Sequence, residues 1–342
     1  MDFLSEIGLF ALKALVIFLF IAGIILTVGL LAMKSQFKTH LEIEKINDRL
    51  KGYGKTIKEF SDDLKLSKEA KKAEKKRLKD EKKNKESEKP KNKLYVMHFN
   101  GDIKASQVEN LREEITAVLT KATPDDEVLV CVESPGGMVP HYGLGASELL
   151  RIREKNIPLT IAVDKIAASG GYLMACTANK IICAPFGIVG SIGVVAQVPN
   201  LNRLLKKLDV DFKEYTAGEY KRTVTMLGEI TPKGEEKFKE QLEQTHVLFK
   251  DFVKTHRPQI DTEKVTTGEY WYGQQALSLG LIDVIKTSDD YIVEAATSRM
   301  VLSVKFEKKQ SLSEKISGFI GATLDLALDK ALAKMEPPNF LK

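Results

Sequence analysis

Twenty consecutive residues near the N-terminus, 14–33, carry no charge and are almost entirely apolar. As an α-helix rising about 1.5 Å per residue, this run would extend roughly 30 Å, the thickness of the hydrocarbon core of a bilayer. A cleaved signal peptide is the competing interpretation, but its apolar region is usually shorter and ends in a small-residue cleavage site. Residues 30–34 read Leu-Leu-Ala-Met-Lys and offer no clear site of that kind. We therefore expect residues 1–33 to form an uncleaved transmembrane anchor.

A charged extension, 34–93, follows the anchor. Its first part, 34–64, has apolar residues at helix-like spacing and predicts a helix: Leu41, Ile43, Ile46 and Leu50. Residues 65–93 hold 14 Lys/Arg and 6 Asp/Glu, and their few large apolar side chains cannot offset the entropy of ordering. We expect a solvated helix or a disordered linker, which Pro90 helps to terminate. Contact with nucleic acid or lipid headgroups is an alternative, but a charged spacer is favoured.

The formal net charge of the whole chain, +5, comes from this linker, because residues 65–93 alone carry a net +8. The rest of the chain is slightly acidic, at about −3. A basic binding face on the folded part is therefore not indicated, and we expect no nucleic-acid partner.

From Leu94 onward, strand-like and helix-like segments alternate, which is typical of an α/β domain with a largely parallel sheet. We assign this domain to residues 94–290 and a helical tail to 291–342. Within the tail, 312–335 form an amphipathic helix, for which docking on its own domain or on a neighbour is favoured over the alternative of a bilayer surface. The expected strands are 94–99, 127–133, 159–164, 180–184, 188–197 and 281–285, and the expected helices are 106–121, 142–155, 170–178, 199–208 and 232–256.

Several common kinds of site are not indicated by the sequence. Three cysteines, an odd and sparse set, do not form a disulfide framework, and no C-x-x-C or Cys/His cluster predicts a metal site. The motifs G-x-S-x-G, H-E-x-x-H and G-x-x-x-x-G-K-[ST] do not occur. None of the five histidines lies beside a candidate nucleophile in sequence. We expect neither a metal nor a cofactor.

Two glycine-containing turns follow expected strands. The first, Ser134-Pro135-Gly136-Gly137, can present backbone N–H groups to a developing oxyanion, although many strand–helix turns are rich in Pro and Gly for geometry alone. The second, Ala168-Ser169-Gly170-Gly171-Tyr172, places a serine between small residues that leave room for a substrate carbonyl. A serine at the start of a helix is also the usual N-cap, so the cap and the nucleophile are both open interpretations of Ser169.

A third motif, Gly218-Glu219-Tyr220-Lys221, lies 52 positions after Ser169. A lone lysine is ordinarily a solvated surface charge. It acts as a general base only when its surroundings keep the amine neutral. The sequence alone does not show that Lys221 has such surroundings.

The order of the three motifs in one α/β domain resembles the signal peptide peptidase A family of Ser–Lys serine proteases. The segments Phe99-Asn100-Gly101 and Gly190-Ser191-Ile192-Gly193-Val194 add to the resemblance, which covers about residues 94–286. A single protease domain behind an anchor and a charged extension is similar to the SohB branch in particular.

The resemblance implies a ClpP/crotonase-like fold of repeated β-β-α units. It implies Ser169 as nucleophile, Lys221 as general base, and an oxyanion hole made by the N–H groups of Gly170 and of Gly136 or Gly137. It places the Ser191 hydroxyl against the lysine amine. In this family the serine and the lysine can come from neighbouring protomers, so a single-copy chain is expected to form homo-oligomers with active sites near subunit interfaces.

The expected function is therefore a membrane-anchored serine endopeptidase acting on signal peptides or other apolar, membrane-associated polypeptides. The alternatives are a crotonase-type acyl-CoA enzyme and a non-catalytic membrane scaffold with a protease-like domain. The resemblance places the chain in a bacterial inner membrane, with catalysis often on the outer side. The excess of lysine and arginine at 34–51, however, favours a cytoplasmic domain under the positive-inside rule.

Overall fold

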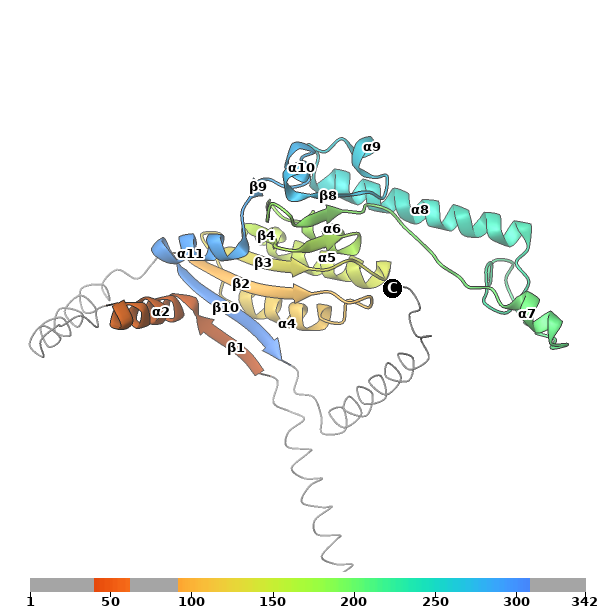
Figure 1. Cartoon of the computed structure of the whole chain (residues 1–342), viewed down its shortest axis with the longest axis horizontal. Helices are drawn as coiled ribbons and strands as arrows, with labels where there is room; N and C mark the ends of the chain where they lie inside the picture. The colour runs from red at the N-terminus through yellow and green to blue at the C-terminus, as the bar shows by residue number, and fades with distance from the viewer. Residues whose placement is uncertain (1–39, 62–91, 308–342) are drawn as a thin grey trace, which may run out of the picture. The chain divides into compact units, whose positions relative to one another are not determined.

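The computed structural model describes residues 40–61 and 92–307 (Figure 1). One compact unit, Glu42–Lys305, contains nearly all of them. The expected anchor at 14–33, nearly all of the lysine-rich linker at 65–93 and the amphipathic tail at 312–335 lie outside the described residues. Within the described ranges, no helix combines the length and the apolar character needed to cross a bilayer.

A seven-stranded sheet runs through the unit, and its parallel pairs bring together strands separated by helices in the chain. Strand β3 shows the sequence signature of such a sheet. Its apolar run is buried nearly throughout, as expected for a strand of a parallel sheet that is covered on both faces. The strand order is β1 (His40–Lys45), β10 (Met300–Glu307), β2 (Lys93–Asn100), β3 (Glu127–Glu133), β4 (Leu159–Val163), β6 (Lys180–Cys183) and β9 (Val284–Ile285).

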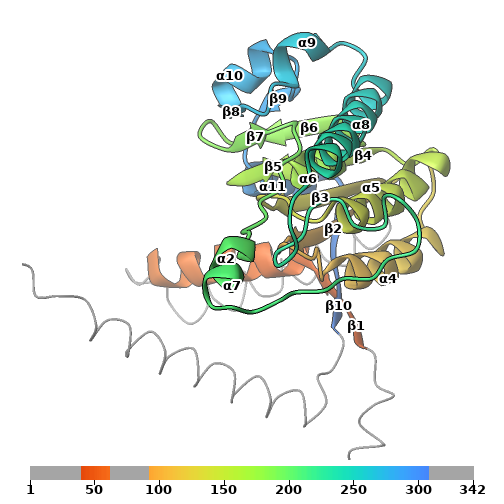
Figure 2. The ribbon, with the colours of Figure 1, turned by 90° about the vertical axis from the view of Figure 1, so that its right-hand side faces the viewer.

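Helices cover both faces of this sheet, and Figure 2 shows them on opposite sides. On one face, α4 (Val108–Leu119) and α5 (Val139–Glu154) bury apolar side chains against β2, β3 and β4 in the larger of two hydrophobic clusters. On the other face, α2 (Ile46–Ser61) and α11 (Ser288–Ser298) form the smaller cluster with the remaining side of the same strands. Alternate residues of each strand thus enter different clusters, because successive side chains of a β-strand point to opposite faces of the sheet.

A smaller, mixed sheet lies beside the first and carries the serine turn. Strand β5 (Ile166–Ala168) pairs in parallel with β7 (Ile188–Gly190), which pairs antiparallel with β8 (Tyr270–Tyr272). Helix α6 (Gly170–Ala175) begins immediately after β5 and the single residue Ser169. The short helices α9 (Thr262–Val265) and α10 (Gly273–Ser278) flank β8 in the chain. The whole is an α/β fold with one mainly parallel and one mixed sheet.

Between β7 and α8 the chain leaves the body of the unit as an arm, residues 193–231, which contains α7 (Asn202–Lys207) (Figure 1). The arm returns to the start of α8 (Pro232–His256), a helix of 25 residues with one buried side chain, Val253. No residue from 193 to 252 is buried within the described chain. The arm and most of α8 therefore lack the packing that normally stabilises helices of this length in water.

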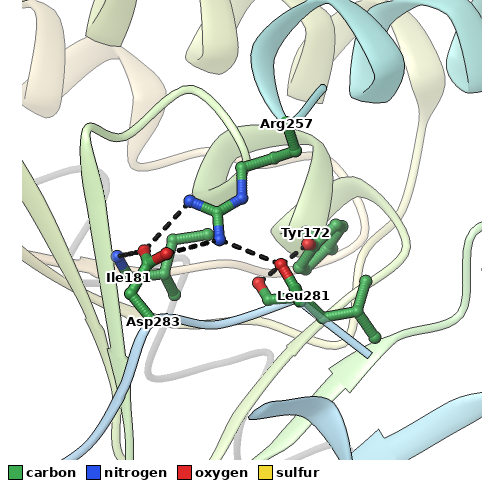
Figure 3. Close-up of polar contacts among 6 residues, drawn as sticks. Tyr172, Ile181, Arg257, Leu281 and Asp283 are labelled. Atoms are coloured by element: carbon green, nitrogen blue, oxygen red, sulfur yellow. Dashed lines mark hydrogen bonds and ion pairs between the residues drawn. The ribbon is translucent and has the colours of Figure 1, made fainter. Parts of the chain in front are cut away.

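The C-terminal end of α8 is tied to the sheet by an ion pair between the buried Arg257 and the partly exposed Asp283 (Figure 3). The Arg257 guanidinium, 3% exposed, donates to both carboxylate oxygens of Asp283 at 2.8 and 2.9 Å and to the Gly280 carbonyl oxygen. Asp283 also accepts the Ile181 N–H of β6 at 2.7 Å. Nearby, the fully buried Tyr172 of α6 donates to the carbonyl oxygen of Leu281 at 2.9 Å.

The structure corrects some predicted elements. Residues 40–45, predicted as helix, form the strand β1, because the partner that selects an extended conformation is β10, more than 250 residues away. The predicted strand 188–197 ends at Gly190, where φ turns positive. Strands β5, β8 and β10 and helices α9, α10 and α11 were not predicted. Strand β3 and helix α8 have their predicted bounds.

Candidate active site

Ser169 occupies a strained, single-residue connection between β5 and α6. Its φ of 51° and ψ of −117° lie in a region that residues with a Cβ rarely adopt. Its N–H donates to the Gly190 carbonyl oxygen at 2.8 Å, and its side chain makes no capping hydrogen bond to the helix. The N-cap interpretation of Ser169 is therefore wrong in its usual sense. A strained, partly exposed serine between a strand and a helix is the geometry that presents a nucleophilic hydroxyl.

The glycine turn after β3 lies directly against this serine. A Cβ on Gly136 would come within 2.7 Å of the Ser169 Cβ and 2.8 Å of the Gly170 nitrogen, and Gly136 has a φ of +95°. The missing side chain thus leaves open the space beside both the serine and the Gly170 N–H. Gly137 packs against the backbone of Ile103, because a Cβ on Gly137 would lie 2.2 Å from the Ile103 carbonyl oxygen.

The hydrogen bonds of this turn distinguish its two glycines. The Gly136 N–H already donates to the Ser134 Oγ at 3.1 Å. Within residues 40–61 and 92–307, the N–H groups of Gly137 and Gly170 have no hydrogen-bond partner in the structure. Two such amides flanking a serine are suited to stabilising the oxyanion of a tetrahedral intermediate, as acyl transfer requires.

Ser191 lies next to the serine turn because β5 and β7 are neighbours. Ala168 and Gly190 are paired in the parallel register, so Ser169 and Ser191 are the next residues of adjacent strands. Ser191 also has a positive φ, 50°, and its N–H donates to the Glu269 carbonyl oxygen. Four of the sequence-predicted residues, Ser169, Gly136, Gly170 and Ser191, are thus brought together at the edge of the small sheet.

Lys221 has a different position. It is exposed and closes a turn in the arm, where its N–H donates to the Gly218 carbonyl oxygen at 3.1 Å. The turn is attached to the start of α8, because Lys233 pairs with Glu219 and Lys237 lies 5.2 Å from the Tyr220 ring centroid. Figure 1 shows the arm extending away from β5 and α6. The structure of one chain does not bring Lys221 to Ser169.

The structure adds two residues that sequence reasoning missed, Ser134 and Tyr142. Both are fully buried beneath the glycine turn, and their hydroxyl oxygens are 2.6 Å apart. Burial raises the pKa of the Tyr142 phenol, which keeps it protonated. The available signal was a serine directly before the glycine turn and a tyrosine eight positions later.

No group of three or more His, Cys, Asp and Glu residues in the described part of the chain could hold a metal ion. Burial raises the pKa of Cys131 and Cys183 to about 12, so these thiols are neutral rather than ligating or nucleophilic.

Comparison with known proteins gives consistent matches. Residues 2–149 match the description "Peptidase family S49 N-terminal" and residues 151–302 match "Peptidase family S49". The chain is 49% identical over 327 residues to the probable protease SohB of Haemophilus influenzae, covering 92% of either chain. It is 57% identical over 200 residues to the protein of the same name from Buchnera aphidicola subsp. Schlechtendalia chinensis, covering 58% of this chain and 66% of the relative.

Among solved structures, one match is a lysine-to-alanine mutant of the membrane-bound stomatin-specific protease 1510-N in complex with a substrate peptide. The alignment has a TM-score of 0.39 and 17% identity, and it covers 67% of this chain and 98% of that one.

Proposed function

Because this chain belongs to peptidase family S49 and is a serine protease, we propose that Ser169 is its nucleophile and Lys221 its general base. The observation that carries the proposal is the strained backbone of Ser169 beside two N–H groups without partners, those of Gly137 and Gly170. Neither feature is needed for a helix cap, whereas acyl transfer requires a presented nucleophile with oxyanion donors beside it.

The proposed reaction proceeds through an acyl-enzyme. The neutral amine of Lys221 takes the proton from the Ser169 hydroxyl as its Oγ attacks the substrate carbonyl, and the N–H groups of Gly137 and Gly170 bind the resulting oxyanion. The tetrahedral intermediate collapses, and the lysine ammonium gives its proton to the leaving amine. Water then attacks the ester as the amine of Lys221 takes a proton from it, and the resulting lysine ammonium passes that proton to the Ser169 Oγ as the acid product leaves. We assign to the Ser191 hydroxyl a hydrogen bond to the Lys221 amine, which the position of Ser191 beside Ser169 in the small sheet supports.

The proposal requires a homo-oligomer in which the arm of one chain brings Lys221 to the Ser169 of another. The at least partial exposure of every residue from 193 to 252 within the described chain supports it, because packing on a partner would supply the stabilisation that this segment lacks there. Exposed apolar side chains along the arm and α8 offer a surface for it: Leu201, Leu204, Leu208, Val210, Met226, Val247 and Leu248.

The fold, the location and the substrates belong to the same proposal. The strand–helix alternation and the small second sheet support the ClpP/crotonase-like arrangement. The uncharged run 14–33 supports a single-pass anchor in a bacterial inner membrane. The family resemblance favours a catalytic domain on the outer side, and the positive charge at 34–51 favours the cytoplasm. An anchored protease meets apolar, membrane-associated polypeptides first, and signal peptides are one such class.

A mixing experiment with full-length chains in detergent tests this proposal. Ser169→Ala and Lys221→Ala are each expected to be inactive on a peptide substrate. Dissociating and reassembling the two together should restore activity, because some sites then combine an intact serine from one chain with an intact lysine from the other. Activity in either single variant at the wild-type rate would refute the assigned residues. Inactive single variants with no recovery on mixing would refute completion between subunits.

A further inference from the structure

We propose that Ser134 and Tyr142 are positioning residues for the oxyanion hole, connected by a directional chain of hydrogen bonds that holds the glycine turn against Ser169. The inference rests on the proposed function of Ser169, and it concerns residues beneath the site that do not touch a substrate.

The direction of the chain follows from the chemistry of its last acceptor. The Tyr142 hydroxyl lies 2.7 Å from the Asp102 carbonyl oxygen, which can only accept, so the phenol proton must point there. The Ser134 hydroxyl, 2.6 Å from the same phenol oxygen, must then donate to it. The Ser134 Oγ in turn accepts the Gly136 N–H at 3.1 Å. Each hydroxyl therefore donates once and accepts once.

This assignment has a consequence for catalysis. Because the Gly136 N–H is committed to Ser134, it is not the oxyanion donor, and the remaining amide of the turn, that of Gly137, takes that role with Gly170. The hydrogen bond to Ser134 fixes the peptide plane that carries the Gly136 N–H. The next plane, which carries the Gly137 N–H, lies between this one and the plane held by the Met138 N–H, which donates to the Ile103 carbonyl oxygen at 2.8 Å. The Ser134 hydroxyl thus anchors one side of the turn that aims the Gly137 N–H.

The same pair contacts the other half of the hole. A Cβ on Gly170 would lie 2.4 Å from the Tyr142 Cγ, so the tyrosine ring packs directly on the residue that carries the second donor. The Ser134 backbone pairs with β5, accepting the Ala168 N–H at 2.9 Å and donating to the Ile166 carbonyl oxygen at 2.8 Å. Both donors and the serine are therefore positioned by one buried pair.

The test is steady-state kinetics of full-length Tyr142→Phe and Ser134→Ala on a peptide substrate. An oxyanion hole acts in the transition state, so kcat should fall about 10-fold for Tyr142→Phe and about 10²-fold for Ser134→Ala, with KM changed less than about 2-fold. The double variant should match Ser134→Ala alone, because the two hydroxyls belong to one chain. Wild-type kcat in both folded single variants, or a double-variant loss equal to the product of the single losses, would overturn the proposal.

Tyr172→Phe is the matched control. Tyr172 is equally buried and donates to a carbonyl oxygen at 2.9 Å, but its hydroxyl is bound to Leu281 and not to the glycine turn. Tyr172→Phe should lower the melting temperature as Tyr142→Phe does and leave kcat within about 2-fold of wild type. An equal loss of kcat in both variants would assign the effect to general destabilisation and overturn the proposal.

Ser169→Ala, measured in parallel, separates this proposal from the proposed function. Retained turnover in Ser169→Ala refutes the nucleophile and the positioning roles with it. An inactive Ser169→Ala beside fully active Ser134→Ala and Tyr142→Phe refutes the positioning roles alone.

Discussion

Replacing Gly136 with alanine perturbs the active site at its narrowest point. The new methyl group would lie 2.7 Å from the Ser169 Cβ and 2.8 Å from the Gly170 nitrogen and the Ala168 carbonyl oxygen, two of them atoms of the backbone. The positive φ of +95° adds strain of about 1–2 kcal/mol for a residue with a Cβ. Overpacking adds about 1–3 kcal/mol. We expect Gly136→Ala to lower the free energy of unfolding by roughly 2–5 kcal/mol.

The effect on catalysis should be larger than the loss of stability alone explains. The methyl group fills the space in front of the Gly170 N–H, and losing one oxyanion donor costs about 10²–10³ in kcat. Peptide hydrolysis at a temperature where the variant is folded, together with urea unfolding, measures both quantities.

Gly143→Ala is the matched control for this substitution. Gly143 lies in α5 with no atom within 4 Å of the position of its Cβ. The alanine should leave kcat unchanged and stabilise the helix by about 0.5–1 kcal/mol. A Gly136→Ala variant with wild-type kcat would refute the open space beside Gly170 as part of the catalytic site.

Three further predictions concern other parts of the unit. Because burial raises the pKa of Cys131 and Cys183 to about 12, only about 10⁻⁴ of either thiol is ionised at pH 8, so alkylation of the folded chain should be slow, rise about tenfold per pH unit, and become fast in denaturant. Arg257→Ala removes the three hydrogen bonds of a buried guanidinium and should lower the free energy of unfolding by about 1–3 kcal/mol in urea titrations, since the Asp283 carboxylate left behind is partly exposed and stays hydrated. Leu204→Glu in α7, where the leucine is 51% exposed, should leave the fold intact and shift the proposed homo-oligomer toward smaller species in sedimentation velocity.

The sequence predicted those helices and strands whose conformation is determined by residues close to one another in the chain. The apolar run of β3 and the long amphipathic α8 have clear boundaries in the sequence, because burial on two faces and a proline at the start of a helix leave direct traces. Strand β1 alternates apolar and charged residues over six positions, too few to outweigh the helical spacing that follows. Its conformation depends on β10, which lies at the other end of the described chain.

The candidate site shows the same division. The glycine turn and the residues around Ser169 could be chosen from their order in the chain, and Gly136, Gly170 and Ser191 lie around that serine. The backbone strain of Ser169 has no local sequence signal, since a serine cap and a serine nucleophile are the same residue type in the same place. Tyr142 was missed because a tyrosine on a helix gives no sign that its hydroxyl reaches back to the preceding turn. The exposure of Lys221 follows from the arm having no buried residue within the part of the chain that the structure describes.

The most direct test of the central assignment is the turnover of Ser169→Ala on a peptide substrate, measured beside wild-type protein of the same oligomeric state. Removing only the Oγ leaves the strained turn, the two amides and the lysine in place, so a loss of activity reports on the nucleophile itself. We predict that kcat falls by a factor on the order of 10⁴–10⁶, as expected when the nucleophile of a serine protease is removed. A Ser169→Ala protein that cleaves the peptide at the wild-type rate would contradict the assignment.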